Sequence, residues 1–131
     1  MKITLQHQDG MRFRAEARRH RLIVDQPAEE GATDQGMSPA ELLLVSLGTC
    51  VGQFVAQYLR LHSLPSERLD VRVEADRCGP LRMSNFRVHV VARGLTERQL
   101  RALEKSLPSG LVQTAITQPN SLTVSAGASA E

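Results

Sequence analysis

The side chain best suited to chemistry in this sequence is Cys50, which lies between two glycines in Gly48-Thr49-Cys50-Val51-Gly52. Each glycine inside a helix costs about 1 kcal/mol relative to alanine, so the pair requires a reason. In one interpretation the glycines leave an opening through which a small oxidant reaches the sulfur. In the other, which composition alone favours, Gly48 and Gly52 share a helix face and let another helix or a partner chain pack closely.

A reactive thiolate at Cys50 needs a cation, because a thiol in the middle of a helix gains little from the helix N-terminus. Glu41 precedes Cys50 by nine residues. On an ideal straight helix it therefore lies roughly 13.5 Å away along the axis and on the opposite side, so the two cannot touch. The candidate cations are five arginines near the N-terminus, for which a solvated strand face is the alternative explanation: Arg12, Arg14, Arg18, Arg19 and Arg21.

Other common chemistries have no support in the sequence. There is no P-loop, G-x-G-x-x-G or G-x-S-x-G motif, which argues against the commoner nucleotide and hydrolase functions. A net charge of +2 and 3% aromatic residues make nucleic acid a poor partner. Neither a metal nor a cofactor is expected, because no CxxC occurs and no i, i+4 pair is found among the four histidines: His7, His20, His62 and His89.

The length of 131 residues predicts a single domain over residues 1–131 that can bury a core of its own. Cys50 and Cys78, together with the lack of an N-terminal signal-like stretch, predict free thiols in a reducing cytoplasm. The most apolar region, 42–61, is interrupted by polar residues. It predicts a buried helix of a soluble protein and no membrane span.

The first elements that must position these residues are strands. Alternating apolar and polar residues at 3–5 and 11–17 predict a hairpin with one wet face, followed by a third strand at 22–24 and a mobile loop at 27–36. Ser38-Pro39-Ala40-Glu41 then predicts a helix start, with a serine N-cap, proline at the first position and a glutamate that closes a capping box. The helix should reach about residue 62, with Cys50 on its apolar face.

The C-terminal half predicts a second hairpin and two further helices. Alternating runs occur at 69–76 and 86–91, and Thr96 caps a helix that Pro108-Ser109-Gly110 interrupts. A short helical piece at 111–116 leads to a final strand at 121–125. This order of elements, in which hairpins dominate, predicts the α+β class.

The segment 36–50, G-M-S-P-A-E-L-L-L-V-S-L-G-T-C, resembles the OsmC/Ohr family of osmotically inducible and organic hydroperoxide resistance proteins. The resemblance implies that family's α+β fold, with antiparallel hairpins around a long central helix. It also implies a cytoplasmic, intertwined homodimer with active sites at the subunit interface. Working members of the family reduce organic hydroperoxides with a pair of cysteines.

Carried over onto this sequence, the resemblance makes Cys50 the peroxidatic cysteine, whose thiolate attacks the peroxide and becomes a sulfenic acid. Glu41 matches the glutamate of the "S-P-x-E-L-L-L" branch, whereas the hydroperoxide-reductase branch has its glutamate where this sequence has Ala40. An arginine from the N-terminal strands completes the family's site, and Arg12 or Arg14 is the nearest counterpart by order along the chain. Two registers place the second, resolving cysteine at residue 110 or 107, which here are glycine and leucine.

Two functions follow from this resemblance. The first is a thiol-dependent hydroperoxide reductase that uses Cys50 alone and needs an external thiol or dithiol to resolve the sulfenic acid. The second is an inactive dimer that binds a small apolar ligand at the subunit interface. The retention of Cys50 with its two glycines favours the first.

Overall fold

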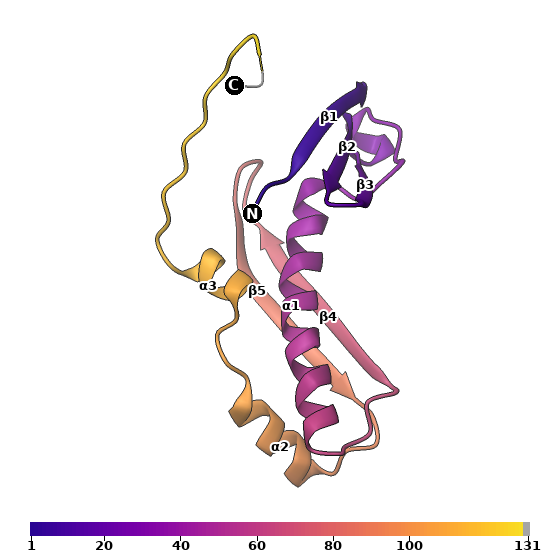
Figure 1. Cartoon of the computed structure of the whole chain (residues 1–131), viewed down its shortest axis with the longest axis vertical. Helices are drawn as coiled ribbons and strands as arrows, with labels where there is room; N and C mark the ends of the chain where they lie inside the picture. Colours follow the sequence, from indigo (N-terminus) through magenta and orange to yellow (C-terminus); the bar gives the residue numbers. More distant parts are fainter. Residues whose placement is uncertain (130–131) are drawn as a thin grey trace.

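Two separate antiparallel sheets, one long helix and two short helices make up the fold (Figure 1). This computed structural model describes residues 1–129. The predicted α+β class is confirmed. In chain order the elements are β1 (Thr4–Asp9), β2 (Arg12–Ala17), β3 (His20–Val24), a 3-10 turn (Ala28–Glu30), α1 (Pro39–Leu61), β4 (Leu69–Arg77), β5 (Met83–Ala92), α2 (Glu97–Ser106) and α3 (Leu111–Thr117).

The N-terminal sheet has the strand order β1-β2-β3 and lies beside the first turns of α1 (Figure 1). Its register pairs Leu5 with Ala15, and Ala15 with Leu22. The prediction of a single wet face is wrong for this chain, because Leu5 and Leu22 on the apolar face remain 57% and 43% exposed. The apolar face is open because no helix within residues 1–129 covers it.

The loop between β3 and α1 is organised around one buried carboxylate, which the sequence analysis did not single out. Asp25 is only 1% exposed. It accepts hydrogen bonds from the Thr33 hydroxyl and from the backbone N–H groups of Gln26 and Gln35. The hydrogen bond from Thr33 is the largest cause that lowers the pKa of Asp25, and the two backbone bonds act in the same direction. The segment predicted to be a mobile loop therefore has an internal anchor.

The start of α1 has the predicted capping box. Ser38 Oγ accepts a hydrogen bond from the Glu41 N–H, and Glu41 Oε1 accepts one from the Ser38 N–H, each at 3.2 Å. Gly36 passes so close to β3 that a Cβ atom there would lie 2.2 Å from the carbonyl oxygen of Ile23. Close backbone packing and helix capping thus explain the first residues of the family-like segment.

The second sheet, β4 and β5, packs against α1, and the two glycines of α1 face it. A Cβ atom at Gly48 would lie 2.4 Å from Cγ2 of Val73, and one at Gly52 would lie 3.1 Å from Cγ2 of Val71. Close packing is therefore the correct interpretation of the glycines, and within the described chain their close neighbour is strand β4. The predicted opening toward the sulfur is wrong.

The buried core lies near the C-terminal end of α1. Val55 and Leu59 are fully buried there, together with Ala92 of β5 and Leu103 of α2. This cluster joins α1, β5 and α2, and it therefore limits where α3 can begin.

The predicted final strand at 121–125 is absent. Residues 119–127 have no regular secondary structure, and the segment runs away from both sheets (Figure 1). Leu122 and Val124 are 88% and 84% exposed. A strand requires a neighbouring edge for its backbone hydrogen bonds, and this segment has none within the described chain.

Candidate functional site

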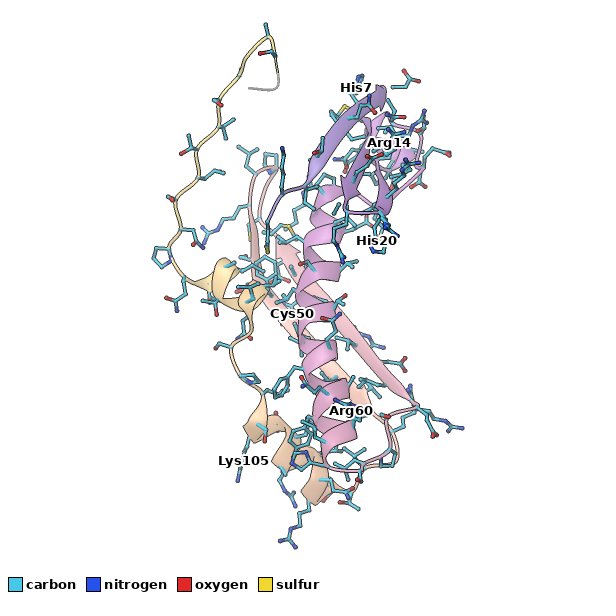
Figure 2. All side chains as sticks on the ribbon, in the orientation of Figure 1. His7, Arg14, His20, Cys50, Arg60 and Lys105 are labelled. Carbon is cyan, nitrogen blue, oxygen red and sulfur yellow. The ribbon has the colours of Figure 1, made fainter. Side chains whose placement is uncertain are left out.

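A groove of about 790 Å³ opens beside Cys50, between α1, β5 and the segment that joins α2 to α3. Cys50 is half-buried and lies in the middle of α1 (Figure 2). A site of this size and lining suits a small, mostly apolar molecule. The apolar side chains that line the groove come from all three of its sides and include Leu47, Phe54, Phe86, Val88, Leu107 and Ile116.

Gly110 lies directly against the sulfur of Cys50. A Cβ atom at Gly110 would stand 2.9 Å from Cys50 Sγ. The two registers place the second cysteine at position 110 or 107. In the structure position 110 lies against the sulfur, and Leu107 lines the groove. Both cysteines of the chain are free thiols.

The structure does not bring Glu41 to Cys50. The carboxylate of Glu41 is engaged in the capping box with Ser38. Ala40, which stands at the glutamate position of the reductase branch, is an exposed residue of the same first turn. Within one chain, Glu41 and the position of Ala40 thus both belong to the start of the helix and not to the surroundings of the thiol.

Arg14 is also remote from Cys50 within one chain. It lies on the N-terminal sheet, whereas Cys50 lies halfway along α1 (Figure 2). Its guanidinium forms an ion pair with Glu16 at 3.0 Å and donates a hydrogen bond to Gln6 at 2.8 Å. No arginine of residues 1–129 is among those that line the groove, and this holds for Arg12, Arg18, Arg19 and Arg21 as well.

The groove also has polar residues that sequence reasoning missed. Glu104 of α2 and Gln113 and Thr117 of α3 line it. Gln113 and Thr117 are spaced i, i+4, so they share one face of α3. That spacing was visible in the sequence, but the direction in which this face points depends on how α3 docks on α1.

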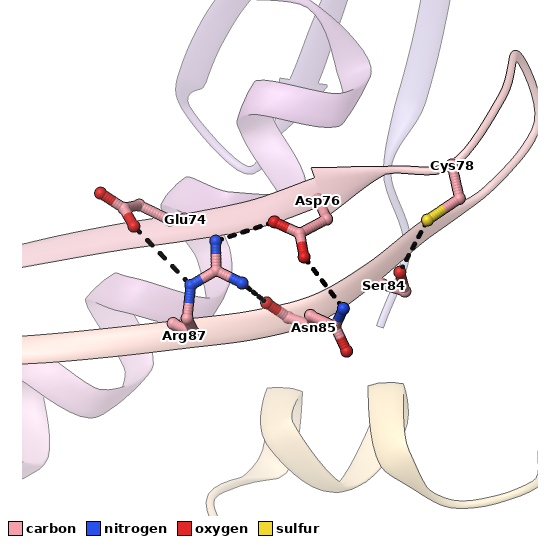
Figure 3. A network of polar contacts seen from close by, with 6 residues as sticks. All are labelled: Glu74, Asp76, Cys78, Ser84, Asn85 and Arg87. Carbon is pink, nitrogen blue, oxygen red and sulfur yellow. Dashed lines mark hydrogen bonds and ion pairs between the residues drawn. The ribbon is translucent and has the colours of Figure 1, made fainter.

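Cys78 lies at the exposed tip of the β4–β5 hairpin, where its sulfur is 3.1 Å from Ser84 Oγ (Figure 3). A network of Arg87, Asp76 and Asn85 holds the strands together beside it. The hydrogen bonds from Arg87 and Asn85 lower the pKa of Asp76. The surroundings of Cys78 are those of a stabilised hairpin end and contain no part of the groove.

No metal-binding cluster occurs in the part of the chain that the structure describes: residues 1–129 contain no group of three His, Cys, Asp or Glu side chains placed to hold an ion.

The profile of the family described as OsmC-like protein matches residues 32–125, so the chain belongs to the OsmC-like family. Members of this family have names linked to osmotic stress and hydroperoxide resistance. Comparison with curated protein sequences finds no significant match.

Solved structures share the fold at low sequence identity. A Psychrobacter arcticus protein described as an osmotic stress induced and detoxification response protein is 17% identical with a TM-score of 0.78, over 90% of this chain and 89% of its own. An OsmC-like protein from Mycoplasma pneumoniae is 14% identical with a TM-score of 0.74, over 89% and 86%. An organic hydroperoxide resistance protein OsmC from Legionella pneumophila is 16% identical with a TM-score of 0.60, over 90% of each chain.

By length and composition alone, α1 would be able to cross a membrane. The core helix of a soluble protein meets the same criteria. A single helix of this kind is weak evidence for a membrane span.

Proposed function

We propose that the protein reduces organic hydroperoxides in oxidative stress defence, with Cys50 as its single peroxidatic cysteine. The observation that carries the proposal is the position of the Cys50 sulfur, which is half-buried at the wall of an apolar groove of about 790 Å³. The groove offers the alkyl or aryl part of a hydroperoxide an apolar surface while its peroxide group meets the sulfur. The name of the related Legionella pneumophila protein, an organic hydroperoxide resistance protein, supports the same substrate class.

In the proposed reaction the Cys50 thiolate attacks the terminal oxygen of the hydroperoxide. The O–O bond breaks, the alkoxide leaves and takes up a proton to become an alcohol, and Cys50 becomes a sulfenic acid. An external thiol then attacks the sulfur and displaces water, which leaves a mixed disulfide. A second thiol attacks this disulfide, releases the oxidised reductant and restores Cys50. We assign Glu41 no step here, because its carboxylate accepts a hydrogen bond from the Ser38 N–H in the capping box of its own chain.

We infer further that the working unit is a cytoplasmic homodimer of one OsmC-like domain per chain. The solvent-accessible surface of the chain is 10,605 Å². A compact monomer of 14.4 kDa would have a solvent-accessible surface of about 6,800 Å². Exposed large apolar side chains lie on the N-terminal sheet, on α1 and on the extended segment 119–127. A second copy supplies both a cover for the sheet and an edge for this segment.

The homodimer also offers a source for the cation that a thiolate at Cys50 needs. Because the groove contains no arginine from the described residues of its own chain, an arginine that serves Cys50 has to come from the second copy. The N-terminal sheet, which contains Arg14, is the uncovered part of the fold and is therefore the part that a dimer would bring to the partner's groove.

A ligand-binding protein without catalysis is the second candidate function. The same groove favours it, since a cavity of this size with apolar walls binds a small apolar ligand whether or not the thiol reacts. In this case Cys50 would remain reduced in the presence of hydroperoxide.

Hydroperoxide consumption separates the two functions. Cumene hydroperoxide is followed with dithiothreitol as reductant for the unaltered protein, Cys50→Ser and the matched control Cys78→Ser. We expect the unaltered protein and Cys78→Ser to consume the hydroperoxide, and Cys50→Ser to fall to the uncatalysed rate. No turnover by the unaltered protein, with Cys50 still a free thiol, would establish the ligand-binding function instead.

A further inference from the structure

Gly110 has no conformational reason to be a glycine. Its backbone angles are φ −77° and ψ 171°, which any L-residue adopts in extended structure. Gly110 is the N-cap of α3, where glycine is one of the favoured residues, and the surroundings of the residue give a second reason for the missing side chain.

The sulfur of Cys50 is the close neighbour of this position. Apart from its chain neighbours, a Cβ atom at position 110 would have only Cys50 Sγ within 4 Å, at 2.9 Å. Apart from the neighbouring residues 109 and 111, no other atom lies within 4 Å of that point, and both Gly110 and Cys50 line the groove. A side chain at this position would therefore crowd the sulfur and fill part of the groove beside it.

We propose that Gly110 determines what resolves oxidised Cys50: the missing side chain keeps a path to the sulfur open for an external thiol. The inference rests on the function proposed above. In the step concerned, the external thiol attacks the sulfenic sulfur, an S–S bond forms, the S–O bond breaks and the oxygen leaves as water. Both sulfur atoms end in a mixed disulfide that occupies the space beside Gly110.

The same geometry predicts what a cysteine would do at this position. In a disulfide, the Cβ atom of one cysteine lies about 3 Å from the sulfur of the other. The 2.9 Å between a Cβ atom at Gly110 and Cys50 Sγ meets this requirement with little movement. Residue 110 therefore decides between two modes of resolution, an external thiol with glycine and an internal disulfide with cysteine.

Thiol exchange with glutathione disulfide tests the open path without any hydroperoxide. The reaction transfers one glutathione to the Cys50 sulfur and releases the other as a thiol. It is followed by intact mass for Cys78→Ser, which removes the other thiol, and for Cys78→Ser with Gly110→Ser. We expect the serine at position 110 to slow the formation of the mixed disulfide about tenfold. Equal rates, with unchanged circular dichroism, would overturn the proposal.

Gly110→Cys in the Cys78→Ser background is the second variant, and it keeps the inference testable if serine perturbs folding. Oxidation with diamide should remove both thiols of the folded protein within one chain, as counted by a thiol reagent and by non-reducing mass. Ser109→Cys in the same background is the matched control, because Ser109 also lines the groove but lies one residue away. Two free thiols in Gly110→Cys after oxidation would contradict the assignment.

These outcomes are independent of catalysis. If the protein reduces no hydroperoxide, glutathione exchange and the engineered disulfide still report on position 110. If it does, Gly110→Cys should yield an internal disulfide where the unaltered protein yields a sulfenic acid that dimedone traps. Dimedone trapping in Gly110→Cys at the level of the unaltered protein would overturn the inference while leaving the proposed function intact.

Discussion

At the scale of single residues, the family-like segment 36–50 separates into residues that build the fold and one that offers chemistry. Gly36 permits the close approach to β3, and Ser38 and Glu41 cap α1. Gly48 lets β4 approach the helix. Only Cys50 faces the groove with a reactive group, so most of the segment serves to hold the helix that presents this thiol.

Cys78 should take no part in the chemistry of Cys50, because it lies at a hairpin tip and contacts Ser84. After one equivalent of an alkyl hydroperoxide, we expect Cys50 to be a sulfenic acid that dimedone traps and Cys78 to remain a thiol. Intact mass under non-reducing conditions measures both. Rapid formation of a Cys50–Cys78 bond, within or between chains, would show that Cys78 is a resolving cysteine.

Asp25 should make the stability of the protein depend on pH in acid. Folding lowers the pKa of Asp25 through the hydrogen bonds from Thr33 and from two backbone N–H groups, so the folded state favours the charged carboxylate. This stabilisation is complete above the pKa of the unfolded state and is lost as the pH falls below about 4 through the lower folded value. We expect the difference in unfolding free energy between the unaltered protein and Asp25→Asn to be largest at neutral pH.

Urea denaturation over a series of pH values measures this difference. Asp34→Asn is the matched control, because Asp34 is an exposed residue of the same loop. A difference for Asp25→Asn that stays constant down to pH 3 would show that the carboxylate charge does not stabilise the loop.

At the scale of elements, α1 packs against β4 with one side and presents Cys50 to the groove with the other. Residues two apart differ by about 200° around the axis, so Gly48 and Gly52 necessarily point away from Cys50. The glycines contact β4, and the opposite side contacts the groove and the segment before α3. Spacing alone therefore argues against a glycine-lined opening to the sulfur.

Valine at the two glycines should destabilise the protein more than serine at Cys50. The Cβ atom at Gly48 would lie 2.4 Å from a methyl group of Val73, and the one at Gly52 would lie 3.1 Å from a methyl group of Val71. Overpacking of about 1 to 3 kcal/mol is expected, with Gly48→Val worse than Gly52→Val. Serine is nearly isosteric with cysteine, so Cys50→Ser should melt close to the unaltered protein.

Thermal melts followed by circular dichroism test this order. Gln57→Val, at an exposed position of α1, is the control for the lower helix propensity of valine. If the two glycine variants have the same melting temperature as Gln57→Val, the close contact with β4 does not contribute to stability.

At the scale of the whole molecule, the elongated chain cannot cover its own apolar surface. We expect a homodimer in sedimentation equilibrium at micromolar concentration. Leu122→Asp with Val124→Asp should shift the equilibrium toward monomer, because these side chains alternate along the extended segment and are exposed in one chain. Thr123→Asp, on the other face of the same segment, is the matched control. A stable 14.4 kDa monomer would contradict the proposed assembly.

Mixed dimers test whether the arginine comes from the second copy. Cys50→Ser alone should be inactive, and Arg14→Ala alone should be impaired in hydroperoxide reduction. After the two variants are unfolded and refolded together, one site of each mixed dimer has Cys50 from one chain and Arg14 from the other. We expect activity to reappear in the mixture. No gain over the separate variants would assign this role to another arginine or to none.

The sequence by itself determined the features that depend on local interactions. The capping box of α1, the helix ends, the two hairpins and the place of Cys50 on an apolar face were all predicted, because hydrogen bonds between near neighbours and residue periodicity set them. The motif also identified the family, whose profile matches residues 32–125.

Tertiary structure alone decided which distant residues meet. That Gly110 lies against Cys50 depends on how α2 packs into the core and where α3 therefore begins. That residues 119–127 form no strand depends on the lack of an edge, since a strand's backbone groups must bond to another strand, however suitable its side chains are. Such contacts require the relative positions of several elements, and no local pattern of residues contains that information.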